Sequence, residues 1–239
     1  MNDALENLLK NPRVWRGRSR AAVSGVPGLA SGYSTLDRHL PGGGWPRHAL
    51  TEILLEHHGM GELQLLMPAL ARLSQAGNGS PGNAVETREA GWIAWIAPPF
   101  QPYPPALLQW GIELSRMLVV HPRRGTDTLW AAGEALSSGN CAAVLLWPDA
   151  LDHRMDDTAS RRLQLAAEKG QSWAIAFRDG KVRSEVSAAA LRLELAKGEQ
   201  GTDVIILKSR GGPPTRVENV TGWQANPSSI QAPQRGRAD

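Results

Sequence analysis

Four apolar runs, separated by helix-like segments, place the strongest constraint on what this chain can fold into. They read WIAWIAP (92–98), RMLVVHP (116–122), CAAVLLWP (141–148) and SWAIAFR (172–178). Segments with helical periodicity lie between them, at 104–112, 126–139 and 156–170. Near-continuous apolar strands that alternate with helices are typical of a parallel sheet covered on both faces. Because a further strand at about 49–55 and a helix at 62–75 precede them, the pattern predicts an α/β fold.

After residue 178 this rhythm stops, and apolar and polar residues alternate without an intervening helix. The alternation predicts two antiparallel edge strands joined by 197–202. At the start of the chain Leu5, Leu8 and Leu9 have the spacing of one face of a short helix. We therefore divide the chain into an N-terminal helix and basic linker (1–24), a core (25–210) and a C-terminal extension (211–239) that is largely flexible toward its end.

Positive charge is concentrated at the two ends of the chain. Residues 1–20 and residues 208–239 each carry five Lys or Arg against two Asp or Glu, so each end is +3 and the part between them is −3. Basic ends of this kind suit nucleic acid or an acidic protein surface. Cys141 is the single cysteine, and no apolar run approaches the roughly 20 residues of a membrane helix. We therefore expect a cytoplasmic protein without disulfides.

The segment EILLEHHGMGELQLL (52–66) has the order of a phosphate-binding loop, in which a strand, a glycine-containing loop and a helix follow one another. A working loop continues with Lys and then Ser or Thr. Here Gly59 and Gly61 are present, but Glu62 and Leu63 occupy those two positions. A carboxylate repels a nearby triphosphate by on the order of several kcal/mol per charge pair. The loop is therefore predicted to oppose nucleotide binding.

The chain contains nine tryptophans against two phenylalanines and two tyrosines. Six of them fall within predicted helices and strands, where we interpret them mainly as packing residues: Trp92, Trp95, Trp110, Trp130, Trp147 and Trp173. Trp15, Trp45 and Trp223 lie in irregular segments. An aromatic side chain in such a place often anchors a partner, so packing and partner contact both stay open for these three.

Two long segments resemble the RecA family. SGYSTLDRHLPGGGWPRHALTEI (31–53) is similar to the segment that leads into that family's phosphate loop, and VVHPRRGTDTLWAAGEALSSGNCAAVLLWPDAL (119–151) to the one that leads into its second ATPase strand. Within this superfamily the chain more closely resembles the ImuA family of translesion-synthesis proteins over roughly 8–220, through NPRVWRG, LPGGGWPRHALTEILL, WIAPPFQPYPPAL and LVVHPR. The SulA division inhibitors are similar over the shorter span from 61 to about 178.

The resemblance implies a RecA-like three-layer sandwich with a mostly parallel central sheet, antiparallel edge strands late in the chain and a short N-terminal helix. It also implies an aspartate at the end of the second ATPase strand, where Trp147 stands, and a glutamate after the preceding strand, where Pro98 and Pro99 stand. Together with Glu62 and Leu63 these changes remove the nucleotide chemistry. We therefore expect no catalytic residue, no metal and no cofactor, with a residual nucleotide-dependent DNA-binding ATPase as the less favoured alternative.

What the resemblance implies about function is a non-catalytic accessory role in SOS-induced mutagenic translesion DNA synthesis. The expected partner is ImuB, an inactive homologue of Y-family polymerases, and RecA, the error-prone polymerase and a second copy of the chain are further candidates. The alternative is a SulA-like inhibitor that acts on the tubulin-like division protein. The candidate partner-binding residues are Leu5, Leu8, Leu9, Val14, Trp15, Arg16, Lys208, Arg210, Arg216 and Trp223. The candidates for weak or indirect DNA contact are Arg18, Arg20, Arg123 and Arg124.

Overall fold

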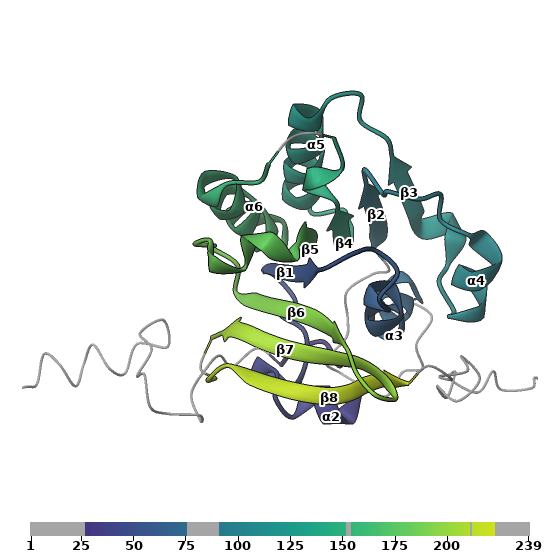
Figure 1. Cartoon of the computed structure of the whole chain (residues 1–239). Helices are drawn as coiled ribbons and strands as arrows, with labels where there is room; N and C mark the ends of the chain where they lie inside the picture. The colour runs from purple at the N-terminus through teal and green to yellow at the C-terminus, as the bar shows by residue number, and fades with distance from the viewer. Residues whose placement is uncertain (1–26, 76–90, 152–153, 211, 223–239) are drawn as a thin grey trace, which may run out of the picture.

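A central sheet of eight strands organises the computed structural model, which describes residues 27–75, 91–151, 154–210 and 212–222. The strands lie in the order β3-β2-β4-β5-β1-β6-β7-β8 (Figure 1). In chain order they are β1 (Leu50–Leu55), β2 (Trp92–Ile96), β3 (Met117–Val120), β4 (Cys141–Leu146), β5 (Trp173–Asp179), β6 (Leu191–Lys197), β7 (Gly201–Ser209) and β8 (Thr215–Gly222).

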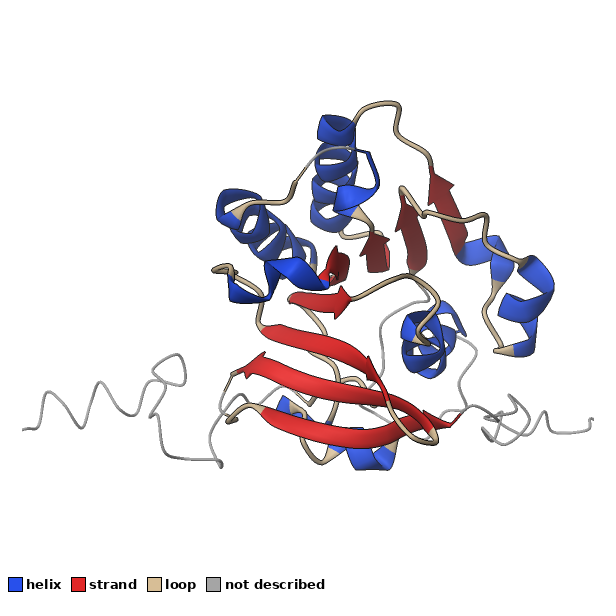
Figure 2. Ribbon diagram, viewed as in Figure 1, coloured by secondary structure: helices blue, strands red, loops and turns tan. Residues whose placement is uncertain are grey.

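Helices cover both faces of this sheet, as the sequence predicts. They are α2 (Ser34–Asp37), α3 (Glu62–Gln75), α4 (Pro104–Gln109), α5 (Gly125–Ser137) and α6 (Asp157–Gly170), with short 3-10 turns η1 (Pro41–Gly43), η2 (Leu114–Arg116), η3 (Pro148–Leu151) and η4 (Gly180–Ser184). Leu65 of α3 belongs to the same buried cluster as Ile53 of β1, whereas Leu163 of α6 packs with Leu50 and Val144 on the opposite face. Figure 2 shows α3 and α4 on one side of the sheet and α5 and α6 on the other. The α/β sandwich is confirmed.

The buried strands explain why their sequences read as continuous apolar runs. All six residues of β1 and all six of β4 are buried, because both strands lie inside the parallel part of the sheet. Trp45 is fully buried and stacks on Trp173 of β5 with ring centroids 5.4 Å apart. Packing therefore accounts for Trp45. Trp130 and Trp92, interpreted above as packing residues, are instead 69% and 42% exposed.

One charged pair interrupts the apolar core. Glu52 in the middle of β1 is fully buried, and its carboxylate accepts hydrogen bonds from Arg192 of β6 at 3.0 Å and from the Ser187 hydroxyl at 2.6 Å. The Arg192 guanidinium also donates to three backbone carbonyls between residues 182 and 185. A buried charge is tolerated when it is paired and fully hydrogen-bonded. The pair therefore holds β6 beside β1 and ties the 180–190 connection to both strands.

The late strands confirm the predicted antiparallel pair and add to it. β6 and β7 are antiparallel to each other and are joined by residues 198–200. The prediction did not include β8, which pairs antiparallel with β7, or the parallel pairing of β6 with β1, which residues 180–190 reach by a crossover without an α-helix. β8 also belongs to the sheet, where Val217 and Val220 are buried, although its residues lie beyond the expected end of the core.

The expected N-terminal helix over 1–24 lies outside the described residues. Within the described part of the chain, none of the helices combines the length and the apolar character that crossing a membrane requires.

Candidate functional site

The loop between β1 and α3 has the backbone of a phosphate-binding loop. Gly59 and Gly61 have φ angles of +90° and +95°, which glycine adopts without the penalty that a side chain imposes. At Gly61 a second constraint applies, because an added Cβ would stand 2.8 Å from the Oγ1 atom of Thr202 in β7. At Gly59 the same position is open space. Turn geometry therefore favours both glycines, and packing against β7 adds to the requirement at Gly61.

Glu62 closes this loop from within. It is the first residue of α3 and only 6% exposed, and both of its carboxylate oxygens accept the backbone N–H of Gly59, at 2.9 and 3.1 Å. In a working phosphate loop such an amide donates to a phosphate oxygen. A carboxylate in the first turn also interacts favourably with the helix dipole. The protein thus supplies its own anion to the loop.

Strands β7 and β8 hold the loop from the other side. The Thr202 hydroxyl donates to the Met60 carbonyl at 2.8 Å. One turn further along α3, the Gln64 carbonyl accepts from the Tyr33 hydroxyl at 3.0 Å, and the Gln64 side chain donates to the Gly222 carbonyl at 3.4 Å. Burial raises the pKa of Tyr33 to about 12, so its hydroxyl remains a donor at neutral pH. The loop and the first turn of α3 are therefore fixed by contacts from three directions.

An aromatic cluster surrounds Trp147, the residue at which the resemblance implies a metal-binding aspartate. Trp147 directly follows β4 and is 3% exposed. It stacks on Phe177 of β5 at a centroid distance of 4.7 Å and lies 5.6 Å from the ring of Trp95. Asp149 lies elsewhere, with its carboxylate 3.9 Å from the Arg178 guanidinium. Among the described residues no group of three or more His, Cys, Asp or Glu side chains could hold a metal ion.

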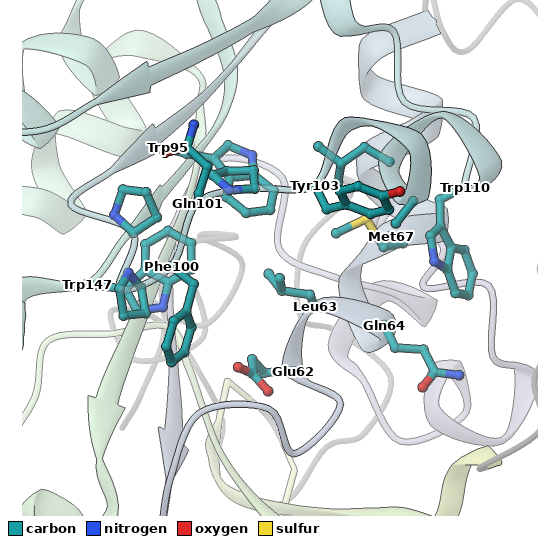
Figure 3. Close-up of a pocket in the computed structure, with 15 residues that line it drawn as sticks. Glu62, Leu63, Gln64, Met67, Trp95, Phe100, Gln101, Tyr103, Trp110 and Trp147 are labelled. Atoms are coloured by element: carbon teal, nitrogen blue, oxygen red, sulfur yellow. The ribbon is translucent and has the colours of Figure 1, made fainter.

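A pocket of about 420 Å³ lies between the closed loop and the segment that follows β2. It opens at the carboxyl ends of β2 and β4, the edge at which open α/β sheets bind their ligands. Figure 3 shows Leu63 in the middle with Glu62 below it, Trp95, Trp147 and Phe100 on one side, and Tyr103 and Trp110 on the other. Outside this lining, His58 of the loop meets Phe100 edge-on at 6.2 Å.

The sequence interpretation found Glu62, Leu63 and Trp147 as lost ATPase positions, and the structure brings all three to this one pocket. It did not find Phe100, Tyr103 or Trp110 as site residues. The segment PPFQPYPP (98–105) carries a signal that could have found Phe100 and Tyr103, because it combines two aromatic residues with five prolines shortly after a mostly buried strand.

The predicted partner-binding residues near the C-terminus are engaged within the protein. Lys208 donates to the Ser187 carbonyl at 2.8 Å, and burial lowers its pKa. Arg210 lies 3.6 Å from the Glu168 carboxylate, and Arg216 donates to Asp203. These contacts stabilise β7 and β8. Predictions that fall outside the described residues are those for Leu5, Leu8, Leu9, Val14, Trp15, Arg16, Arg18, Arg20 and Trp223.

Arg123 and Arg124 are exposed between β3 and α5. They follow the carboxyl end of β3, the strand next to β2 in the sheet. Neither contributes to the lining of the pocket. Their predicted contact with DNA remains a prediction.

No protein-family model matches the chain. The chain is related to both SulA and ImuA proteins. It is 33% identical over 109 residues to the cell division inhibitor SulA of Photorhabdus laumondii, and this alignment covers 46% of this chain and 59% of that protein. It is 32% identical over 147 residues to Protein ImuA of Caulobacter vibrioides, and this alignment covers 60% of this chain and 54% of that protein. The chain thus spans a little over half the length of these curated relatives.

Among solved structures, SulA from Pseudomonas aeruginosa is 27% identical and matches 54% of this chain and 98% of its own, with a TM-score of 0.40.

Proposed function

We propose that the protein is a non-catalytic accessory factor of the DNA-damage response that works as a protein-interaction adaptor in mutagenic translesion synthesis. The observation that carries this proposal is the closed phosphate loop, in which the Glu62 carboxylate already occupies the Gly59 amide. The relation to ImuA supplies the role, since its alignment spans 147 residues against 109 and 87 for the SulA relatives. In this role the fold serves as a scaffold for contacts.

The same loop argues against nucleotide turnover. A triphosphate seated there would break the charge-assisted hydrogen bond that the Gly59 N–H shares between both Glu62 oxygens, and it would face a buried carboxylate. Two like charges 4 Å apart near a protein surface repel each other by about 4 kcal/mol. The lysine that would compensate is absent at Glu62, and Leu63 and Trp147 offer no magnesium ligand. We therefore propose that the protein acts through the surfaces that it offers to partner proteins and that it catalyses no reaction.

Isothermal titration with ATP and magnesium tests the first half of the proposal. The expected result is no heat of binding by the wild-type chain. Saturable heat, or protection against thermal unfolding by ATP and magnesium, would overturn the non-catalytic interpretation and favour a residual ATPase.

Co-purification with the ImuB homologue of the same organism tests the second half. We expect the full chain to retain ImuB and to release it when residues 1–20 are deleted, because that basic end carries the Leu5, Leu8 and Leu9 face and lies outside the sheet. Deletion of the late segment is unsuitable as a test of partner binding, since β8 is part of the sheet. In that segment Arg216→Ala is a milder change, because it replaces one predicted partner-binding side chain without deleting the strand. Failure of the full chain to retain ImuB would refute the adaptor role.

A second candidate function is inhibition of cell division. The identity of 33% to a SulA protein favours it. Expression of the chain in its own host without DNA damage would then produce filamentous cells, and the chain would retain the tubulin-like division protein in the same co-purification. If the cells divide normally and the chain retains ImuB, the result favours the adaptor role over inhibition of cell division.

A further inference from the structure

The pocket beside the closed loop has a buried aromatic part and an exposed aromatic rim. Trp95 and Trp147 are each 3% exposed, whereas Phe100 and Tyr103 are 70% and 68% exposed. Its volume of about 420 Å³ lies within the range of about 300–1,000 Å³ that is usual for ligand sites. The pocket is therefore lined largely by aromatic side chains and meets solvent at Phe100 and Tyr103 (Figure 3).

The formal charge of this pocket is negative. Of its fifteen described lining residues, Glu62 is the one with a formal charge at neutral pH, and none is Lys, Arg or His. The Glu62 carboxylate uses one lone pair on each oxygen for the Gly59 amide, and each oxygen has a second. An anion would meet this carboxylate without a compensating cation. A cation would meet both a carboxylate and the negative faces of aromatic rings.

The rim is itself an apolar surface, because Phe100 and Tyr103 line the pocket and stay mostly exposed. Large exposed apolar side chains around a buried aromatic centre are typical of protein-binding surfaces. A free small cation would leave this rim uncovered, whereas a polypeptide that inserts one side chain into the pocket would cover it.

We propose that the pocket binds an arginine side chain on an extended segment of a partner protein. The guanidinium enters between the aromatic rings toward Glu62, and flanking apolar residues of the partner cover Phe100 and Tyr103. Arginine fits better than lysine because its planar guanidinium stacks on rings and donates two parallel hydrogen bonds to a carboxylate. The inference goes beyond the proposed function, since it assigns a surface and a recognised side chain whichever protein carries the segment.

Selection of random displayed peptides on the full chain tests this inference. We expect the enriched peptides to share an arginine flanked by apolar residues. A synthetic copy of the best peptide is then measured by fluorescence polarisation, together with copies in which its arginine is replaced by lysine or glutamine. Glutamine should weaken binding the most and lysine less, because lysine keeps the charge and loses the planar stack.

Variants of the chain locate the binding. Phe100→Ala and Tyr103→Ala should each weaken the peptide by about tenfold, because each removes a large exposed aromatic ring that the apolar residues of the peptide cover. Glu62→Gln should weaken it to a similar degree, because glutamine keeps an acceptor for Gly59 and removes the charge. Trp130→Ala is the matched control, since Trp130 is equally exposed on α5, across the sheet. It should leave the affinity unchanged.

Circular dichroism and thermal unfolding establish that each variant is folded before its affinity is compared. Peptides without a shared cationic residue, failure to select any peptide, or equal losses in Trp130→Ala and Tyr103→Ala would each overturn the inference. Any of these results would leave the ATP and ImuB experiments unaffected, so failure here is distinguishable from failure of the proposed function.

Discussion

Removing the internal anion of the loop should measurably destabilise the fold. Glu62→Ala deletes a carboxylate that accepts the Gly59 amide with both oxygens from a site only 6% exposed. A hydrogen bond to a charged group contributes about 1.5–3 kcal/mol, and a negative charge in the first helical turn adds about 0.3–1 kcal/mol. Alanine returns a few tenths of a kcal/mol through its higher helix propensity. The expected loss is therefore about 2 kcal/mol.

Urea unfolding at neutral pH and a thermal scan measure this loss. At about 2–4 °C per kcal/mol for a domain of this size, Tm should fall by about 4–8 °C. Glu62→Gln is the matched control, because it retains one neutral acceptor for Gly59 and should lose only about half as much. Equal stability of Glu62→Ala and the wild type would show that the amide is well satisfied by water. The account of a loop closed by its own anion would then be refuted.

Two further changes probe the surroundings of the loop and the edge of the sheet. Gly61→Ala and Gly59→Ala both force alanine into a left-handed conformation, at a cost of about 1–2 kcal/mol. Gly61→Ala should unfold at a clearly lower urea concentration than Gly59→Ala, because only its Cβ meets a β7 hydroxyl, at 2.8 Å. Equal losses of stability would contradict that packing. At Asp203 burial raises the pKa, yet hydrogen bonds from the Asn219 amide and from Arg216 outweigh burial and hold it below its usual value. Its stabilisation is thus complete above about pH 4, the unfolded value, and is lost as pH falls through the lower folded value. Asp203→Asn should accordingly lower Tm near neutral pH, with a difference that shrinks in acid; a difference independent of pH would contradict the pairing.

The order of strands and helices could be predicted from the sequence because it depends on local periodicity. Apolar runs such as 141–148 recur between helical segments, and each becomes a strand of the sheet; three are mostly buried, and β3 at the edge is partly exposed. The prediction that ATPase chemistry is lost depends on residue types at neighbouring positions in a similar way. Phosphate and magnesium require particular side chains at fixed positions after a strand, and Glu62, Leu63 and Trp147 supply none of them.

The parallel pairing of β6 with β1 and the membership of β8 in the sheet could not be predicted. Alternation of apolar and polar residues indicates a strand, but it does not identify the neighbour with which that strand pairs. What fixes β6 beside β1 is the buried pair of Arg192 with Glu52, two residues 140 positions apart in the chain. Pattern within a window of a few residues carries no information about such a partner.

The sequence by itself determined the fold class and the absence of a phosphate-binding cation, since both depend on which residue types occupy neighbouring positions. The tertiary structure alone decided that Glu62 takes over the Gly59 amide and that Trp95, Phe100 and Trp147 surround one pocket. The physical reason is that strand order brings the carboxyl ends of β2 and β4 beside the first turn of α3. The pocket is therefore assembled by packing between segments that are distant in the chain, and local propensity does not determine it.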